Sequence, residues 1–235
     1  MAQLTGNARN ILVGASPLFI SNIDSTTSGY ATYENAEPGT TNAGAFATGT
    51  SYTDTLNAVS SGTFYYRNVG YTNNGLQITY NPTYDSVTVD QLLDTAKLFK
   101  SAMEVMIATE MSEGTLENVL VVFGQKSSTL TTTGTAPAET STLGLEAGAL
   151  GAEPTERQLF AVGNAPTVNS AGTDVYSERV YYARRVLSVQ QSQFTLARNT
   201  PTTFPVTFRL LPDANYAGAE YGKIIDRTSG TAFAL

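Results

Sequence analysis

The segment from Lys100 to Gly124 changes from one hydrophobic pattern to another. In its first half, every second residue from Met103 to Met111 is apolar or weakly polar, and Glu104 and Glu110 fall between them. A period of two is typical of a strand with one buried face. The second half has a period of i, i+3, i+4 and i+7, carried by Leu116, Val119, Leu120 and Phe123. The pattern therefore predicts an acid-bearing strand that leads directly into a short amphipathic helix.

The ends of this helix are also marked in the sequence. Ser112 is placed to cap the first turn, and Glu113 and Glu117 follow it, where negative charge is favourable. Gly124 is a typical residue just beyond a helix end. We expect the four apolar residues to form one stripe that packs against a sheet.

The segments before residue 100 are rich in β-branched and aromatic residues. Residues 63–71 and 76–84 flank Asn73-Asn74-Gly75, and an Asn-Gly pair at this place predicts a hairpin turn. Residues 85–91 alternate and predict a further strand. Residues 92–100 have no clear period, and we interpret them as a connection with one helical turn.

Strand-like segments return after residue 153. They cover 158–168, 174–190, 203–213 and 219–227. Near the start of the chain, residues 11–20 are apolar and are interrupted by Gly14 and Pro17. They are too short to span a membrane and no small-x-small cleavage site follows promptly, so two short strand pieces are favoured over a signal peptide.

Two long stretches lack a sustained pattern. Residues 25–62 have few aliphatic side chains but several aromatic ones, which a fully disordered linker would rarely carry. Residues 126–153 are rich in Thr, Ala and Gly, and we interpret them as a flexible excursion or a loose hairpin. Together, the patterns predict one mainly β domain over residues 1–235. Its architecture would be a β-barrel or a sandwich of two packed antiparallel sheets, with one flanking α-helix and these two long loop insertions.

The composition excludes the most common catalytic arrangements. The chain has no Cys and no His, which excludes the usual zinc sites and the Ser-His and Cys-His catalytic arrangements. Glu104 and Glu110 share a strand face, but roughly 20 Å separates them at about 3.3 Å per residue, too far for one glycosidase site. A carboxylate pair of Asp90 with Glu104 or Glu113 stays geometrically possible. We expect no enzymatic activity and no cofactor or metal.

Charge and aromatic content limit the binding partners. The net charge of −7 argues against nucleic-acid binding and against an anionic membrane surface. The 13 tyrosines and 10 phenylalanines are compatible with a sugar-binding platform, or with packing at sheet edges and subunit contacts. We favour the second interpretation.

Two blocks resemble a known family. Residues 87–124, VTVDQLLDTAKLFKSAMEVMIATEMSEGTLENVLVVFG, are similar to the central block of the major tail tube proteins of tailed bacteriophages. In that block a strand ends near VDQ, a long strand follows, and a Glu-x-Thr-Leu-Glu-Asn motif opens a short helix. Residues 204–227, FPVTFRLLPDANYAGAEYGKIIDR, resemble the closing block of the same family. The two blocks cover about a quarter of the chain.

The resemblance implies a structural role in a virion tail. The family fold is a β-barrel or sandwich with a flanking helix, shared with contractile tails and type VI secretion tubes. Six copies form a ring, and the rings stack head-to-tail into a tube that conducts DNA and ejected proteins into the host cell. The implied partners are further copies of the chain and the tail tip or baseplate, tape measure and tail terminator proteins. The protein would be made in the host cytoplasm.

The same resemblance gives roles to particular residues. Glu104, Glu110 and Asp90 become candidates for an acidic lumen that repels DNA, or else they face another subunit or solvent. The stretch 25–62 becomes an arm that reaches the next ring. Its candidate contacts are Tyr30, Tyr33, Phe46 and Tyr52. The alternative is an adhesin-like or carbohydrate-binding β module of a virion or cell surface.

Overall fold

All strand pairs among the described residues are antiparallel. The computed structural model describes residues 14, 16–21, 24–26, 55–56, 66–92, 94–135, 138–165, 177–189 and 192–228. Its first half contains β1 (Leu18–Ser21), β2 (Thr55–Leu56), β3 (Tyr66–Asn68), β4 (Thr72–Thr88), β5 (Thr95–Met111) and α2 (Leu116–Val122). A 3-10 turn (Ser127–Thr129) then precedes β6 (Leu130–Thr133), β7 (Thr140–Leu143), β8 (Arg157–Asn164), β9 (Ser177–Ser188), β10 (Phe204–Leu210) and β11 (Gly222–Thr228).

Two antiparallel sheets and one helix make up the described part of the chain, which confirms the predicted fold class. The main sheet has the order β2-β3-β1-β8-β9-β10-β5-β4, and β11 pairs with β9 beside β10. The second sheet is the ribbon β6-β7. The main sheet is open, because β2 and β4 stand at its two ends and the barrel is not closed within the described residues.

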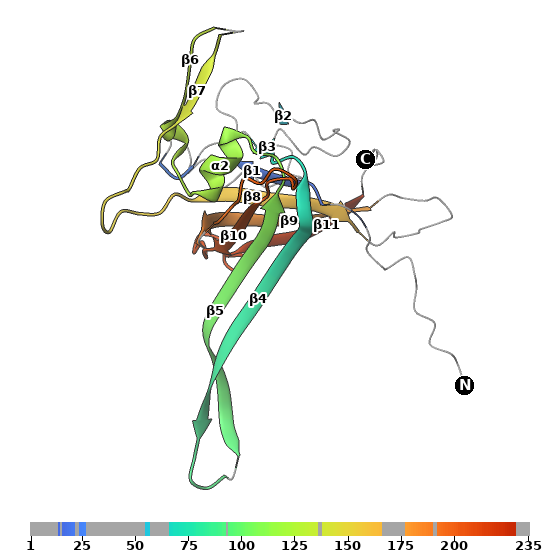
Figure 1. Cartoon of the computed structure of the whole chain (residues 1–235). Helices are drawn as coiled ribbons and strands as arrows, with labels where there is room; N and C mark the ends of the chain where they lie inside the picture. The colour runs from blue at the N-terminus through green and yellow to red at the C-terminus, as the bar shows by residue number, and fades with distance from the viewer. Residues whose placement is uncertain are drawn as a thin grey trace, which may run out of the picture.

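The main core lies on the face of the sheet that α2 covers (Figure 1). Alternate residues of β5 and β10 point into it: Val105, Ile107, Met111, Phe204, Val206, Phe208 and Leu210. A smaller cluster occupies the opposite face of β1, β8 and β9, where the Phe19 and Phe160 rings stack at 4.7 Å. The alternation predicted for residues 103–111 is therefore present, since Val105, Ile107, Thr109 and Met111 are buried while Glu104 and Glu110 are half-buried.

A long hairpin replaces the three shorter segments expected between residues 76 and 100. Both β4 and β5 have 17 residues, and they pair from Thr72↔Met111 to Thr88↔Thr95. The helical turn predicted within 92–100 is wrong, because residues 95–100 continue β5. Asn74 and Gly75 have φ of 59° and 67°, but they form a bulge inside β4 and not a hairpin turn. A hairpin turn and a β-bulge both favour Asn-Gly because both need positive φ. The Asn-Gly pair alone therefore did not distinguish a turn from a bulge.

The helix is shorter than predicted and begins at another cap. The hydroxyl of Thr115, not that of Ser112, accepts from the backbone N–H of Asn118 at 3.3 Å. The helix ends at Val122, and Gly124 follows with φ of 63°, as expected for a glycine after a helix. The predicted stripe is only partly buried. Leu120 is buried and Val119 packs partly on the core, whereas Leu116 and Phe123 are exposed at 36% and 37%.

The helix is also attached by a polar residue that the hydrophobic pattern did not reveal. Asn118 is buried with Leu120, Val121 and Val122. Its side-chain N–H groups donate to Val69 O at 2.9 Å and Glu113 O at 2.8 Å, and its Oδ1 accepts from Arg67 Nη1 at 2.5 Å. These bonds fix the start of α2 to the segment that joins β3 to β4.

A buried ion pair ties the end of β1 to the start of β8. The Asp24 and Arg157 side chains are almost completely buried, and Arg157 Nη2 lies 3.4 Å from Asp24 Oδ2. Arg157 also donates to Ser21 O, to Gln125 O and to the Ser127 hydroxyl. Burial alone would raise the pKa of Asp24, but hydrogen bonds from Thr26 and Ser127 outweigh it and hold the pKa below its ordinary value.

The predicted insertion at 126–153 contains the ribbon β6-β7, so its interpretation as a hairpin is confirmed. Leu130 and Leu143, at the base of the ribbon, pack against the main core. The remaining strand predictions overlap described strands: β1 begins within 11–20 and ends at Ser21, and β8, β9, β10 and β11 overlap the four segments after residue 153. The first of the two strand pieces predicted in 11–20 includes residues 11–13, which lie outside the described residues.

Candidate assembly surface

The β4-β5 hairpin extends far beyond the body of the molecule (Figure 1). Only residues 106–111 of β5 pair with β10, so within the described chain residues 95–105 pair with β4 alone. This unsupported part is roughly 35 Å long at about 3.3 Å per residue. An isolated two-stranded hairpin is only marginally stable in water, so a third partner is expected along this length.

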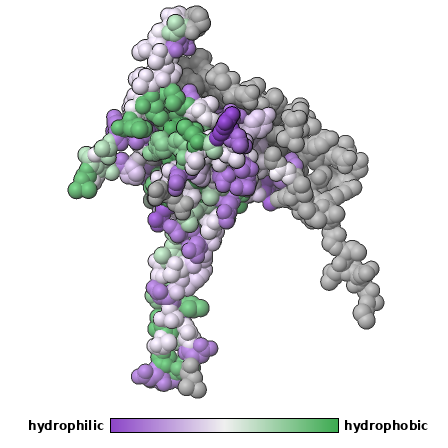
Figure 2. Space-filling model, in the orientation of Figure 1, coloured by the Kyte–Doolittle hydropathy of each residue, from purple (hydrophilic) through white to green (hydrophobic). Residues whose placement is uncertain are grey.

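One face of the projecting hairpin is apolar. Strand alternation places it as a continuation of the main core, because Ile78 pairs with Ile107 and Tyr80 pairs with Val105. We call it the apolar stripe: Ile78, Tyr80, Tyr84 and Leu98, with exposed fractions of 43%, 64%, 57% and 63%. Pro82 and Met103 pair between these residues, and the Lys100 ammonium lies 5.9 Å from the Tyr80 ring centroid. Figure 2 shows apolar residues distributed along the hairpin to its far end.

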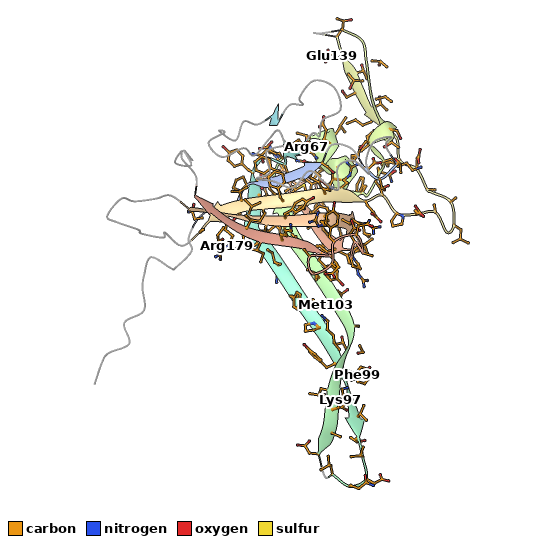
Figure 3. The ribbon with its side chains drawn as sticks, turned by 180° about the vertical axis from the view of Figure 1, so that it is seen from behind. Arg67, Lys97, Phe99, Met103, Glu139 and Arg179 are labelled. Carbon is orange, nitrogen blue, oxygen red and sulfur yellow. The ribbon has the colours of Figure 1, made fainter. Side chains whose placement is uncertain are left out.

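The other face of the hairpin is mainly polar near the body. Asn81 pairs with Glu104 and Thr83 pairs with Ala102. Towards the end this face becomes mixed, with Asp85 opposite Phe99 and Val87 opposite Lys97. Figure 3 labels Lys97, Phe99 and Met103 in order along the projection. The hairpin is therefore amphipathic, and the part of the chain that the structure describes leaves its apolar stripe exposed.

The three predicted acidic residues lie in different surroundings. Glu104 and Glu110 are on the same face of β5, as predicted. Glu104 Oε1 lies 3.7 Å from Arg209 Nη1, where the Arg209 side chain is exposed and that of Glu104 is half-buried. Glu110 accepts a hydrogen bond from the Asn73 side chain at 3.3 Å. Asp90 is exposed in the turn that joins β4 to β5, so it does not share a site with either glutamate.

Two hollows in the surface are candidates for a catalytic or metal-binding site. The smaller, about 240 Å³, lies beside the β4 bulge and is lined by Glu110, Gly75, Gln77 and neutral residues of β10. The larger, about 530 Å³, lies between β3 and α2 and contains Arg67 and Arg157 with Glu113 and Glu117. Burial lowers the pKa of Arg67 to about 10, so it stays protonated at neutral pH. The described residues contain no group of His, Cys, Asp or Glu arranged for a metal.

The remaining predicted contacts cannot be placed. Tyr30, Tyr33, Phe46 and Tyr52 of the proposed arm lie outside the described residues. The apolar stripe, in contrast, was missed at the level of sequence. Its signal was the alternation of Ile78, Tyr80 and Tyr84 across Pro82. Beyond residue 85 the apolar residues Val87 and Val89 fall on the opposite side of the strand, so this alternation does not continue.

The described residues thus offer one extended surface that is exposed in the isolated subunit. It consists of the apolar stripe, the open edge of β4 and the polar face that carries Glu104 and Arg209. Among the described helices, none is long and apolar enough to cross a membrane. Comparison with protein-family models gives no match, and no curated protein is significantly similar in sequence.

Proposed function

We propose that this chain is the subunit of a phage tail tube: copies join into rings, and the rings stack into a conduit for DNA and ejected proteins. The observation that carries the proposal is the projecting β4-β5 hairpin with its apolar stripe. Burying side chains of this size stabilises a protein by about 1.5–3 kcal/mol each, and the isolated subunit leaves this stabilisation unused. The resemblance of residues 87–124, which include β5 and α2, agrees with the same role.

The geometry favours a repeating assembly over a closed pair. The apolar stripe and the open β4 edge are on one side of the subunit, and β2 ends the sheet at the other. Contacts between unlike surfaces of identical copies generate rings when the rotation closes, and filaments when it does not. Pairing across copies would also cover the exposed edge of β4, which otherwise invites aggregation. The tail tip or baseplate, tape measure and tail terminator proteins would contact the finished tube.

Electron microscopy of the purified protein over a concentration series tests the proposal. We expect uniform rings or hollow tubes, with the assembled fraction rising with protein concentration because the contacts are between copies. Discrete monomers or trimers at every concentration, also in the presence of the tail tip complex as an initiator, would contradict it. Binding of oligosaccharides by such particles would instead support the carbohydrate-binding module.

The polar face of the hairpin would then line the lumen. Because Arg209 lies beside Glu104, the charge at this position is partly compensated and less acidic than the sequence suggested. Glu104→Lys replaces this pair by two cations, repeated in every subunit, and would attract the phosphates that pass. We expect normal tubes but at least tenfold slower or less complete DNA ejection. Glu104→Gln, which adds no positive charge, serves as control. Unchanged DNA delivery by Glu104→Lys would contradict the proposal that Glu104 lines the lumen.

A further inference from the structure

Two hairpins leave the body of the subunit in opposite directions. In Figure 1 the ribbon β6-β7 projects from one end and the β4-β5 hairpin from the other. Figure 3 shows the same arrangement from behind, with Glu139 at the end of the ribbon and Lys97 and Phe99 near the end of the hairpin. When subunits are stacked in one orientation, the ribbon of one copy faces the hairpin of the next.

The ribbon has edges that are open to pairing. Its strands, Leu130–Thr133 and Thr140–Leu143, contain only Leu, Thr and Ser. Natural edge strands are usually protected by charges, proline or bulges, and β6 and β7 have none of these. Leu130 and Leu143 attach the base to the core, and Gly144 N donates to Thr129 O at 2.9 Å. The exposed remainder is a firmly anchored two-stranded ribbon, which is only marginally stable by itself.

The end of the β4-β5 hairpin offers a complementary edge. Within the described residues, β4 pairs only with β5, so the backbone groups on its outer edge have no strand partner. Pro82 lacks an N–H group and limits pairing at the middle of β4. The segment beyond it, residues 83–88, is free of proline and is long enough to accept a ribbon strand, which has four residues.

We propose that the β6-β7 ribbon of one copy adds to the outer edge of β4, at residues 83–88, in a copy of the next ring. The occupant is a second copy because every subunit carries both elements, at opposite ends, and a contact between them repeats without limit along a stack. Recognition is through backbone hydrogen bonds, as in other cases of strand addition. This inference rests on the proposed function, and it assigns a role to a segment that has no counterpart in the family resemblance.

Shortening the ribbon tests the proposal. In the variant, residues 132–141 are replaced by Asn-Gly, which suits a two-residue turn, while Leu130 and Leu143 remain on the core. We expect a folded protein that forms single rings but shows at least a tenfold loss in mean tube length by electron microscopy. The control is Thr132→Val with Ser141→Val, which removes the 3.0 Å contact between the two hydroxyls but keeps the backbone edge. This control should stack normally. Tubes of normal length from the shortened variant would overturn the proposal.

Cysteine cross-linking gives a second, direct measurement. The chain contains no cysteine, so Thr132→Cys can be mixed with proteins that carry a single cysteine at one of residues 84–88. We expect disulfides between the two proteins at alternate positions, since paired strands bring Cα atoms within the 4.4–6.8 Å that a disulfide requires. Absence of cross-links in assembled tubes would overturn the pairing. Cross-links in a protein that forms no ring would instead overturn the proposed function and leave the pairing intact.

Discussion

Replacing Tyr80 and Leu98 together by glutamate is expected to abolish tube formation and leave the subunit folded. Both side chains are more than 60% exposed in the isolated subunit, so neither contributes much to its own core. In an assembly that covers the apolar stripe, each glutamate would be buried without a partner, and an uncompensated buried charge costs several kcal/mol. The change should therefore shift assembly to at least a hundredfold higher protein concentration, measured by light scattering and electron microscopy.

The control for this prediction lies on the same strands. Asn81→Glu with Ala102→Glu introduces the same two charges on the polar face, at positions that are also exposed. If the apolar stripe is the contact surface, this variant assembles at nearly the concentration of the unaltered protein. Equal loss of assembly in both variants would mean that hairpin charge, and not burial of the stripe, determines the result. Unchanged unfolding midpoints in urea would show that neither variant is misfolded.

The sequence predicted the part of β5 from Met103 to Met111 because a local pattern carried it. From Val105 to Met111 each buried side chain alternates with a half-buried one, and a single sheet with one covered face produces this period. The β4 half was divided at the wrong places for a related reason. An Asn-Gly pair is a turn signal in isolation, but pairing with β5 accommodates Asn74-Gly75 as a bulge inside β4.

The helix shows where a local pattern is insufficient. The pattern placed Leu116, Val119, Leu120 and Phe123 on the buried side, but the residues buried in this seven-residue helix are Asn118, Leu120, Val121 and Val122. The buried side then includes Asn118, which no hydrophobic period would select. Its partners Arg67 and Val69 come from a segment about 50 positions earlier in the chain. Contacts between residues so far apart in sequence depend on the tertiary fold. They leave no periodic spacing in a single sequence from which they could be predicted.

The buried pair of Asp24 and Arg157 provides the second prediction with a large effect. Asp24→Asn is expected to lower the free energy of unfolding at neutral pH by about 3–5 kcal/mol, since it leaves a buried guanidinium without its counter-charge. Most domains are stable by only about 5–15 kcal/mol, so the variant should be close to its limit of stability. The measurement is urea unfolding, followed by circular dichroism. Asp226→Asn is the matched control, because Asp226 also binds an arginine, Arg179, but is 52% exposed and should cost about 1 kcal/mol or less.

The pH dependence distinguishes this mechanism from a simple loss of packing. The pKa of Asp24 lies below its ordinary value of 3.8 in the folded protein, so the unfolded chain binds the proton more tightly. The stabilisation by Asp24 is therefore complete above pH 3.8 and disappears as the pH falls through the folded-state pKa. The unaltered protein should lose stability over this range, and Asp24→Asn should lose less, so that their unfolding free energies converge in acid. A constant difference between the two proteins at every pH would show that the carboxylate charge is not what stabilises the junction of β1 and β8.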